Sequence, residues 1–406
     1  IVTPQGNQLN ITGGQTSRNG ANLFHSFSQF GLSPSQIANF QSNPQIQNIL
    51  GRINGGSPSL INGLIQVTGS NANLYLMNPA GIVFGANAQL NVPGSFTATT
   101  ATAIEFADGW FDAFGSNQYP ALNGTPTTFA FNLNQPGAIV NAGNLAVGQG
   151  QALNLMGGTI VSTGQLTAPG GQIVVAAVPG TSLVRISQPG SPLSLEIEPL
   201  SLASPAAFTP LTLPELLTGP AAIAAPNLTT SPSGTHQLQL ASANAPVPID
   251  PGTTLVSGTV TVAQPTSGKI GGSLAILGKK VGLVGATLDA SGANGGGTVL
   301  VGGAYQGKGT VPNATRTFVS SDSVIHADAL ASGNGGKVVI WADDVTAFKG
   351  AITAKGGARS GNGGLVEVSG KQTLIFQGSA DLSAPQGMLG NLLLDPQNLT
   401  IVAGTG

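Results

Sequence analysis

Residues 325–341 read IHADALASGNGGKVVIW, and this stretch predicts the fold. An apolar-x-Ala strand at its start is followed by a turn that ends in Gly335-Gly336, and then by the β-rich run Val338-Val339-Ile340-Trp341. A unit that recurs with variable spacing is typical of a solenoid, in which each coil buries its inner face only by stacking on its neighbours. The same unit recurs at Leu166-Thr167-Ala168, Leu288-Asp289-Ala290, Ile352-Thr353-Ala354 and Leu382-Ser383-Ala384.

Paired glycines close most of these turns. We expect them to supply positive φ angles at tight corners, and we expect the asparagines that precede three of the pairs to stack on one another. Because the strands are short and helical signals nearly absent, the sequence predicts an all-β parallel β-helix of about 12 to 16 coils spaced ~4.8 Å apart. The pairs are Gly170-Gly171, Gly295-Gly296, Gly335-Gly336 and Gly363-Gly364, and the asparagines are Asn294, Asn334 and Asn362.

The composition fits a folded, helix-poor chain. Charged residues make up 7% of the 406 residues, against roughly 25% in ordinary soluble domains. The hydrophobic fraction of 41% is nevertheless enough to build a core. A net charge of −2 offers no electrostatic surface for nucleic acid, and the absence of cysteine excludes disulfides and thiolate metal sites. We therefore expect no nucleic-acid partner, no metal and no cofactor.

No segment is apolar enough to span a membrane as a helix. The longest apolar run, Ile173 to Val178, is far shorter than the 18 or so residues that a spanning helix needs. Residues 1–20 lack a charged region of the kind that opens a signal peptide, so we expect that any such peptide has been removed.

The N-terminal third has a different texture from the repeats. Residues 1–131 hold 11 of the 15 Phe, which predicts an aromatic cap that shields the open end of the solenoid. Within it, Ser33-Pro34-Ser35-Gln36 combines an N-cap, a Pro at the first helical position and a capping-box Gln, so we predict a short helix running on through Ile37 and Phe40. Residues 188–252 are rich in Pro, which breaks β-ladders, and predict an excursion packed outside the coils.

Two motif groups carry a family resemblance. GANLFHSFSQF (residues 20–30) and Asn78-Pro79-Ala80-Gly81 within LYLMNPAGIVFG (residues 74–85) resemble the secretion domain of filamentous haemagglutinins and related two-partner secretion exoproteins. GNGGLVEVSGK (residues 361–371) and LLDP (residues 393–396) resemble passenger repeats of the same family, in a form similar to cyanobacterial members. By its residue types alone, the Asn-Pro-Ala-Gly stretch predicts a type I turn. The family usually has Asn where this chain has Ala80.

The resemblance implies a right-handed parallel β-helix with an N-terminal cap, secreted through the periplasm of a Gram-negative envelope to the cell surface or medium. It divides the chain into a secretion domain (1–187), the Pro-rich excursion (188–252) and passenger repeats (253–406). The periplasmic modules of a cognate outer-membrane barrel would bind the first domain. The passenger would be a monomeric adhesin or structural filament that binds a host-cell or surface glycan or protein receptor. The implied recognition residues are Asn22, Leu23, Phe24, His25, Ser26, Phe27, Asn78, Pro79, Ala80 and Gly81.

Two alternatives stay open. The first is a glycan-active lyase or hydrolase, which needs convergent carboxylates; Asp343 and Asp344 are adjacent in sequence, so on a strand they would point to opposite faces. The second is the front end of a contact-dependent toxin, since those chains share the secretion module. No nucleophile elbow surrounds His25, His236 or His326, so we predict no catalytic residue. The carboxylates considered are Asp289, Asp322, Asp328, Asp343, Asp344 and Glu367.

Overall fold

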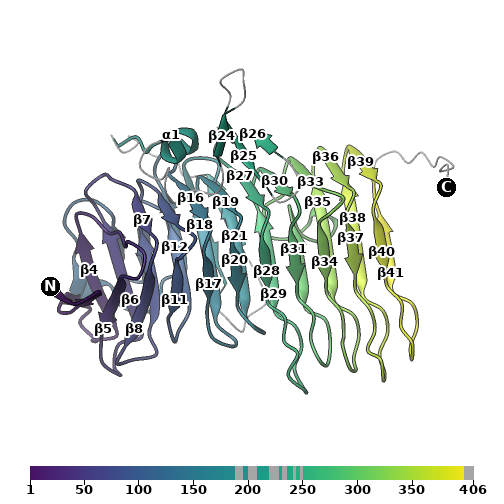
Figure 1. The fold of residues 1–406 in the computed structure, drawn as a ribbon, viewed down its shortest axis with the longest axis horizontal. Helices are drawn as coiled ribbons and strands as arrows, with labels where there is room; N and C mark the ends of the chain where they lie inside the picture. Colours follow the sequence, from purple (N-terminus) through teal and green to yellow (C-terminus); the bar gives the residue numbers. More distant parts are fainter. Residues whose placement is uncertain are drawn as a thin grey trace.

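Each coil of the chain contributes strands to parallel sheets that run along a solenoid (Figure 1). The computed structural model describes residues 1–187, 195–199, 208–218, 228–230, 236–240, 244–246 and 250–396. Three long sheets, here called A, B and C, form the walls of the helix, and the chain visits them in the order A, B, C. The all-β parallel β-helix predicted from the repeats is therefore confirmed.

Sheet A begins with an antiparallel hairpin, and the strands from β2 on are parallel. Its strands are β1 (Val2–Gln5), β2 (Gln8–Ile11), β5 (Ile37–Gln41), β8 (Leu64–Thr68), β11 (Gln89–Asn91), β17 (Asn144–Ala146), β20 (Gln165–Thr167), β28 (Thr259–Thr261), β31 (Thr287–Asp289), β34 (Val324–His326), β37 (Ala351–Thr353) and β40 (Ser379–Asp381).

Sheet B also starts with one antiparallel pair and continues in parallel. Its strands are β3 (Gln15–Thr16), β4 (Asn22–Phe27), β6 (Asn48–Ile53), β9 (Asn73–Met77), β12 (Phe96–Thr99), β18 (Ala152–Gly157), β21 (Gln172–Ala177), β29 (Ser273–Leu277), β32 (Thr298–Val301), β35 (Lys337–Ala342), β38 (Leu365–Gly370) and β41 (Asn391–Leu394).

Sheet C is shorter and parallel throughout. Its strands are β7 (Ser59–Ile61), β10 (Ile82–Phe84), β16 (Ala138–Asn141), β19 (Thr159–Ser162), β27 (Thr253–Val256), β30 (Lys280–Leu283), β33 (Arg316–Val319), β36 (Val345–Phe348) and β39 (Thr373–Phe376).

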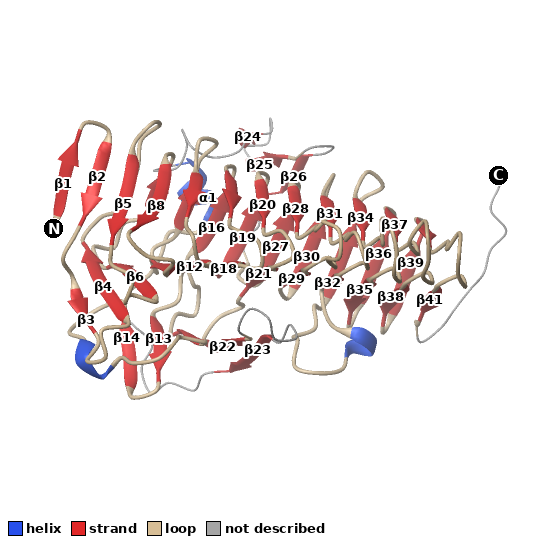
Figure 2. Cartoon of the chain, turned by 90° about the horizontal axis from the view of Figure 1, so that it is seen from below, coloured by secondary structure: helices blue, strands red, loops and turns tan. Residues whose placement is uncertain are grey.

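The remaining elements lie outside the coils (Figure 2). An antiparallel sheet D comprises β13 (Ala103–Phe106), β14 (Gly109–Asp112), β15 (Thr128–Phe131), β22 (Ser182–Ile186) and β23 (Leu195–Pro199). A small sheet E comprises β24 (Leu228–Thr230), β25 (His236–Gln239) and β26 (Asn244–Pro246). The helices are α1 (Leu213–Thr218) and two 3-10 turns, η1 (Tyr119–Ala121) and η2 (Tyr305–Gly307).

All of the extra-helical elements leave the coil at the same corner, between sheets B and C. Sheet D strands and η1 follow β12, the excursion follows β21, and η2 follows β32. The coils close behind the excursion, because β19 pairs with β27 and β21 pairs with β29. Chain spent in these excursions explains why sheets A and B have 12 strands each, or 11 parallel layers, fewer than the 12 to 16 predicted.

The helix predicted after Ser33 is wrong. Gln36 does bond back to the Ser33 N–H through its side-chain oxygen at 2.8 Å, as a capping box requires. However, Ile37–Gln41 is strand β5, which pairs in parallel with β2 and β8 on either side. Two flanking ladders outweigh a local capping signal, since most helical stability in proteins comes from tertiary packing.

The predicted role of the glycine pairs is confirmed at Gly170 and Gly295, whose φ angles are 60° and 150°, and needs correction at the other two pairs. Gly335, Gly336, Gly363 and Gly364 do not have positive φ. Instead, a Cβ on Gly336 would run into the carbonyl oxygen of Gly297 one layer below, and a Cβ on Gly364 would meet that of Gly336. These glycines therefore let successive layers approach closely. Register places Gly297, rather than Gly296, in this column, because Thr298 aligns with Lys337.

The last apolar-x-Ala unit is displaced from the register. Ile352 aligns with Ala380, so Ala380-Asp381-Leu382 occupies the place that the sequence assigned to Leu382-Ser383-Ala384. Two of the three asparagines are linked between layers as expected: the Asn334 side-chain oxygen accepts the Asn362 N–H at 2.8 Å, and that of Asn362 accepts the Met388 N–H at 2.9 Å. Asn294 departs from the expectation, because its side-chain amide donates to the Ser332 hydroxyl at 2.8 Å.

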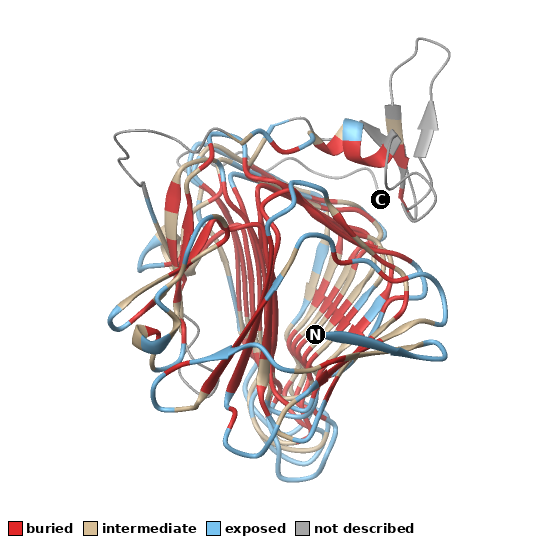
Figure 3. Cartoon of the chain, turned by 90° about the vertical axis from the view of Figure 1, so that its left-hand side faces the viewer, coloured by how far each residue is buried: buried red, intermediate tan, exposed pale blue. Residues whose placement is uncertain are grey.

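Two apolar cores lie on opposite faces of sheet B (Figure 3). One fills the interior of the helix along its length. The other lies between the outer face of sheet B and sheet D, and includes Phe106, Phe111, Phe129 and Phe131. The aromatic texture of the N-terminal third therefore belongs partly to this outer core. None of the helices in the described part of the chain has the length and apolar character needed to cross a membrane.

Candidate recognition motifs

The six residues of the first motif form β4, a strand buried on both faces. Leu23 points into the helix interior, and Phe24 joins the outer core under sheet D. The Phe24 ring lies 5.1 Å from that of Phe111 and 5.4 Å from that of Tyr119. Only Ser26 is exposed, and Phe27 is half-buried. In the folded chain the strand presents almost no side chain to a partner.

Asn22 belongs to an asparagine ladder. Its side-chain oxygen accepts a hydrogen bond from Asn48 at 2.8 Å, and Asn48 accepts one from Asn73 at 3.0 Å, across successive layers of sheet B. The Asn22 amide nitrogen donates to the carbonyls of Leu122 and Gly124, which ties the first coil to the segment that crosses its outer face. Asn48 and Asn73 are not among the residues predicted from the sequence, although asparagine recurs at the starts of these strands.

Ser26 is held by a buried arginine. The Arg52 Nε donates to the Ser26 hydroxyl at 2.7 Å, and its Nη1 donates to the carbonyls of Asp112 and Gly115. The guanidinium also lies 5.8 Å from the centre of the Phe111 ring. Arg52 therefore joins β4 and β6 to the extra-helical loop, a role that its isolated position in the sequence did not reveal.

His25 is a neutral histidine in an aromatic pocket. Its ring lies 5.7 Å from that of Phe40 and 6.0 Å from that of Phe27, and its Nε2 has no hydrogen-bond partner. Burial, helped by the positive charge of the Ile1 amino group, lowers the pKa of His25 to about 4. This is packing for a cap at the end of the solenoid, and it gives no nucleophile or metal site.

The second motif forms the corner between β9 and β10. The Gly81 N–H donates to the Asn78 carbonyl at 3.1 Å, which closes the predicted turn, and the Ala80 N–H donates to the Asn78 side-chain oxygen at 3.0 Å. The Asn78 amide nitrogen donates to the Ser57 carbonyl and the Ser59 hydroxyl of the layer below. Asn78, Pro79, Ala80 and Gly81 are all buried.

The stacking brings the two motifs to the same corner. β4, β6 and β9 are consecutive strands of sheet B, so the end of β4 and the turn at 78–81 lie on one edge, two layers apart. Eight of the ten predicted residues are buried, the exceptions being Ser26 and Phe27. Whatever binds these residues must meet them before the coils and the segments that cover them have closed.

The acidic side chains considered for glycan chemistry do not converge. Asp343 accepts hydrogen bonds from Trp341 and Asn313, whereas Asp344 pairs with Arg316. Asp289 lies beside His326 in the ladder of sheet A. Asp328 bonds to Thr353 and to the Lys355 N–H, and Asp322 bonds to Ser320. Each has its own structural partner.

Glu367 is the one fully buried carboxyl group among these candidates. It lies on β38 and accepts hydrogen bonds from the Gln306 N–H at 2.9 Å and from the Ser369 hydroxyl at 2.9 Å. Burial raises its pKa above the ordinary range, although these two hydrogen bonds oppose the shift. Glu367 therefore anchors η2 against the outer face of sheet B and does not face a cleft.

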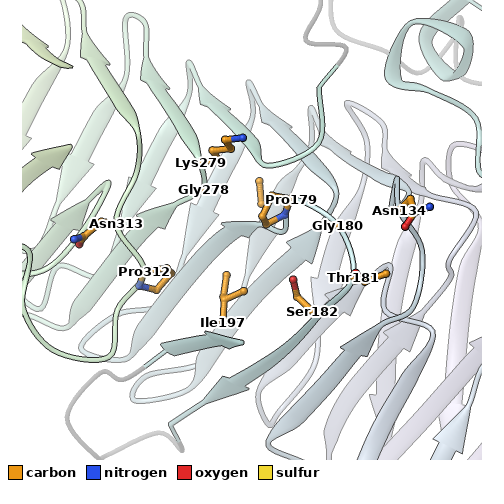
Figure 4. Close-up of a pocket in the computed structure, with 11 residues that line it drawn as sticks. Asn134, Pro179, Gly180, Thr181, Ser182, Ile197, Gly278, Lys279, Pro312 and Asn313 are labelled. Carbon is orange, nitrogen blue, oxygen red and sulfur yellow. The ribbon is translucent and has the colours of Figure 1, made fainter. Parts of the chain in front are cut away.

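A groove lies between sheet D and the coils (Figure 4). It has a volume of about 520 Å³, and its rim carries Asn134, Ser182, Lys279 and Asn313. None of the described residues that line it carries a carboxylate. Within the described ranges, no three His, Asp or Glu side chains come together in a way that could hold a metal ion. The side chain of His236 lies outside the described residues.

Comparison with known proteins gives a family match. A family model described as the TPS secretion domain matches residues 1–201. The sequence matches none of the curated proteins with which it was compared. The crystal structure of the HMW1 secretion domain from Haemophilus influenzae is similar, with 21% identity, a TM-score of 0.48, and coverage of 97% of each chain. The filamentous hemagglutinin secretion domain shows 15% identity, a TM-score of 0.33, and coverage of 96% of this chain and 97% of that one. The chain therefore carries, over its first 201 residues, the TPS secretion domain of a two-partner secretion exoprotein.

Proposed function

We propose that this exoprotein is recognised by its cognate outer-membrane transporter in an unfolded or partly folded state, and that residues 22–27 and 78–81 are the segments that the transporter binds. The observation that carries the proposal is the burial of eight of these ten residues in the finished fold. A binding segment that ends up inside a core is accessible only before that core forms. The periplasmic modules of the transporter would therefore meet a chain whose coils and outer covers have not all closed.

Folding outside the cell would then help export. Each new coil buries its apolar inner face on the coil before it, as the continuous interior core requires. A coil that has folded outside would resist being drawn back through a narrow pore, because burial of apolar surface opposes unfolding by roughly 25 cal/mol per Å². Stacking layer by layer would bias movement outward.

We propose the same division of labour along the chain as the sequence suggested: a secretion domain at 1–187, an excursion at 188–252 and passenger repeats at 253–406. The passenger would act at the cell surface or in the medium as a monomeric adhesin or filament, without enzymatic activity, and would bind a glycan or protein receptor. The separate partners of Asp343, Asp344 and Asp328 support this over glycan cleavage.

The test is secretion from a Gram-negative host with and without the cognate transporter. The chain should reach the medium only with the transporter, and replacing residues 78–81 should abolish its release. The matched control replaces the exposed residues Ala358, Arg359 and Ser360 and should be released normally. Release without the transporter, or normal release of the 78–81 variant, would contradict the proposal.

A further inference from the structure

An apolar stripe runs along the outer face of sheet C. Outward-facing residues in register on successive strands form it, and in ordinary coils such residues face water. The stripe passes beside the turn at 78–81, because Val83 lies on β10, the strand that follows this turn. The first five members of the stripe are Leu60, Val83, Val140, Val161 and Leu255.

The far end of the same stripe shows what this face looks like without a cover. Register continues through Gly282, Phe318, Ala347 and Ile375. Phe318 is 40% exposed and Ile375 42% exposed, whereas Val83, Val140 and Val161 are fully buried. Since all lie on the same face of the same sheet, the difference comes from what lies on top.

The cover is part of the excursion. Leu213, Leu216 and Leu217 of α1 pack against the buried part of the stripe, in one cluster with Leu238 and Leu240. Figure 1 shows α1 outside the coils, over the N-terminal part of sheet C. A Cβ placed on Gly81 would lie 3.7 Å from Leu216 Cδ2, so α1 covers the edge of the turn at 78–81 as well.

The covering helix has its own local start signal. The Thr212 N–H donates to the Glu215 carboxylate at 2.8 Å, the Thr212 hydroxyl does so at 2.7 Å, and the Leu216 N–H donates to the Thr212 carbonyl. In return, the Glu215 N–H donates to the Thr212 hydroxyl oxygen at 3.5 Å, which completes a capping box at the start of the helix. The coils, by contrast, stack without the excursion, because β19 pairs directly with β27. The cover and the stack are thus separable.

We propose that α1 is a latch that closes over the turn at 78–81 and the neighbouring stripe after the secretion domain has folded, and so withdraws this corner from the transporter. The inference rests on the proposed function and adds a release step to it. Residues 213–217 follow the turn by more than a hundred positions in sequence, so the corner can form before its cover arrives. Until then, Val83, Val140 and Val161 offer an apolar surface beside the turn.

The test uses the absence of native cysteine. A single thiol is introduced by Val83→Cys under the latch, or by Phe318→Cys on the uncovered part of the stripe. Each is combined with Leu216→Asp/Leu217→Asp, which opens the latch, or with Leu211→Asp, the same chemical change at an exposed neighbour. Maleimide labelling then reports accessibility, and binding to the purified periplasmic modules of the transporter reports recognition.

With the latch intact, or with Leu211→Asp, the Val83→Cys thiol should react with maleimide at least about ten times more slowly than the Phe318→Cys thiol. A buried thiol reacts only when the structure that covers it opens locally. Opening the latch should remove this difference and allow the folded chain to bind the modules. Chain diluted from urea should bind in every variant, which tests the proposed function independently.

Three results would overturn the inference. Equal labelling at positions 83 and 318 in the intact chain would show that no latch covers the stripe. Labelling that rises on opening, without binding above that of Leu211→Asp, would show that the latch does not control recognition, while binding of the urea-diluted chain would leave the proposed function standing. Failure of the urea-diluted chain to bind would overturn the proposed function and the release step together.

Discussion

At the scale of single residues, glycine sets the layer spacing. Gly297, Gly336 and Gly364 stand in one column where each Cβ position is taken by the carbonyl of the layer before. Their φ angles are not the reason, since any residue could adopt them. Neighbouring strands of a sheet are held about 4.8 Å apart by their hydrogen bonds, so a side chain in this column cannot be relieved by moving the layers apart.

We therefore expect Gly336→Ala to lower the free energy of unfolding by about 1–3 kcal/mol, the usual cost of overpacking. The control is Gly148→Ala, where the nearest atom to a new Cβ is 3.8 Å away. Urea unfolding of the two variants measures the difference. Equal midpoints would show that the layers can shift to accept a methyl group.

A second residue-scale prediction concerns His25, whose pKa is about 4 in the fold against 6.5 ordinarily. Between these values the unfolded chain binds a proton that the folded chain excludes. The free energy of unfolding should therefore fall as the pH drops from 6.5 towards 4, by about 3 kcal/mol over the full window.

His25→Phe keeps an aromatic ring in the pocket and removes the titration, so its stability should depend less on pH between 7 and 5 than that of the parent. His326→Gln, at a half-exposed site, serves as the control and should behave like the parent chain. Urea titrations at pH 7 and pH 5 decide this. An identical pH dependence of the parent and His25→Phe would mean that His25 is not the group responsible.

At the scale of elements, antiparallel strand pairs close the N-terminal end of the solenoid. The β1–β2 hairpin closes sheet A at the N-terminal end, and β3 pairs antiparallel with β4 to close sheet B. The sequence predicts a cap in this region that contains a short helix. Strands form the cap instead, because they pair directly with the N–H and C=O groups of the sheet edges.

Removing residues 1–16 should therefore leave β4 and β5 as open edges above an apolar interior, and the shortened chain should associate in a concentration-dependent way. Sedimentation at several concentrations measures this. Adding Asn39→Pro, which takes a donor from the exposed β5 edge, should reduce the association. A shortened chain that stays monomeric would show that the hairpin is not the protecting element.

At the scale of the whole molecule, the fold suits the proposed folding after export. Its interior is continuous from the first coil to the last, and no disulfide holds any part of it in advance. A chain that must pass through a pore unfolded should be stopped by a covalent link between coils.

Thr259 and Thr287 are register partners on neighbouring strands of sheet A, at a spacing of about 4.8 Å that suits a disulfide. Thr259→Cys/Thr287→Cys should therefore be retained in the cell after oxidation in the periplasm and released when a reductant is added. Each single-cysteine variant should be exported normally. Equal export of the oxidised double variant would argue that folded coils can cross.

The sequence by itself determined the class of fold, because the apolar-x-Ala units, the paired glycines and the scarcity of charge all favour stacked short strands. It also marked the turn at 78–81, whose Asn, Pro and Gly act through bonds within four residues. Only the tertiary structure decided that Ile37–Gln41 is a strand, that Leu382 takes the place of an alanine, and that Arg52 and the Asn22–Asn48–Asn73 ladder hold the first coils. It likewise decided that α1 covers Val83. Each of these depends on partners tens of residues away, and the register between coils, which loops of variable length do not reveal, selects those partners.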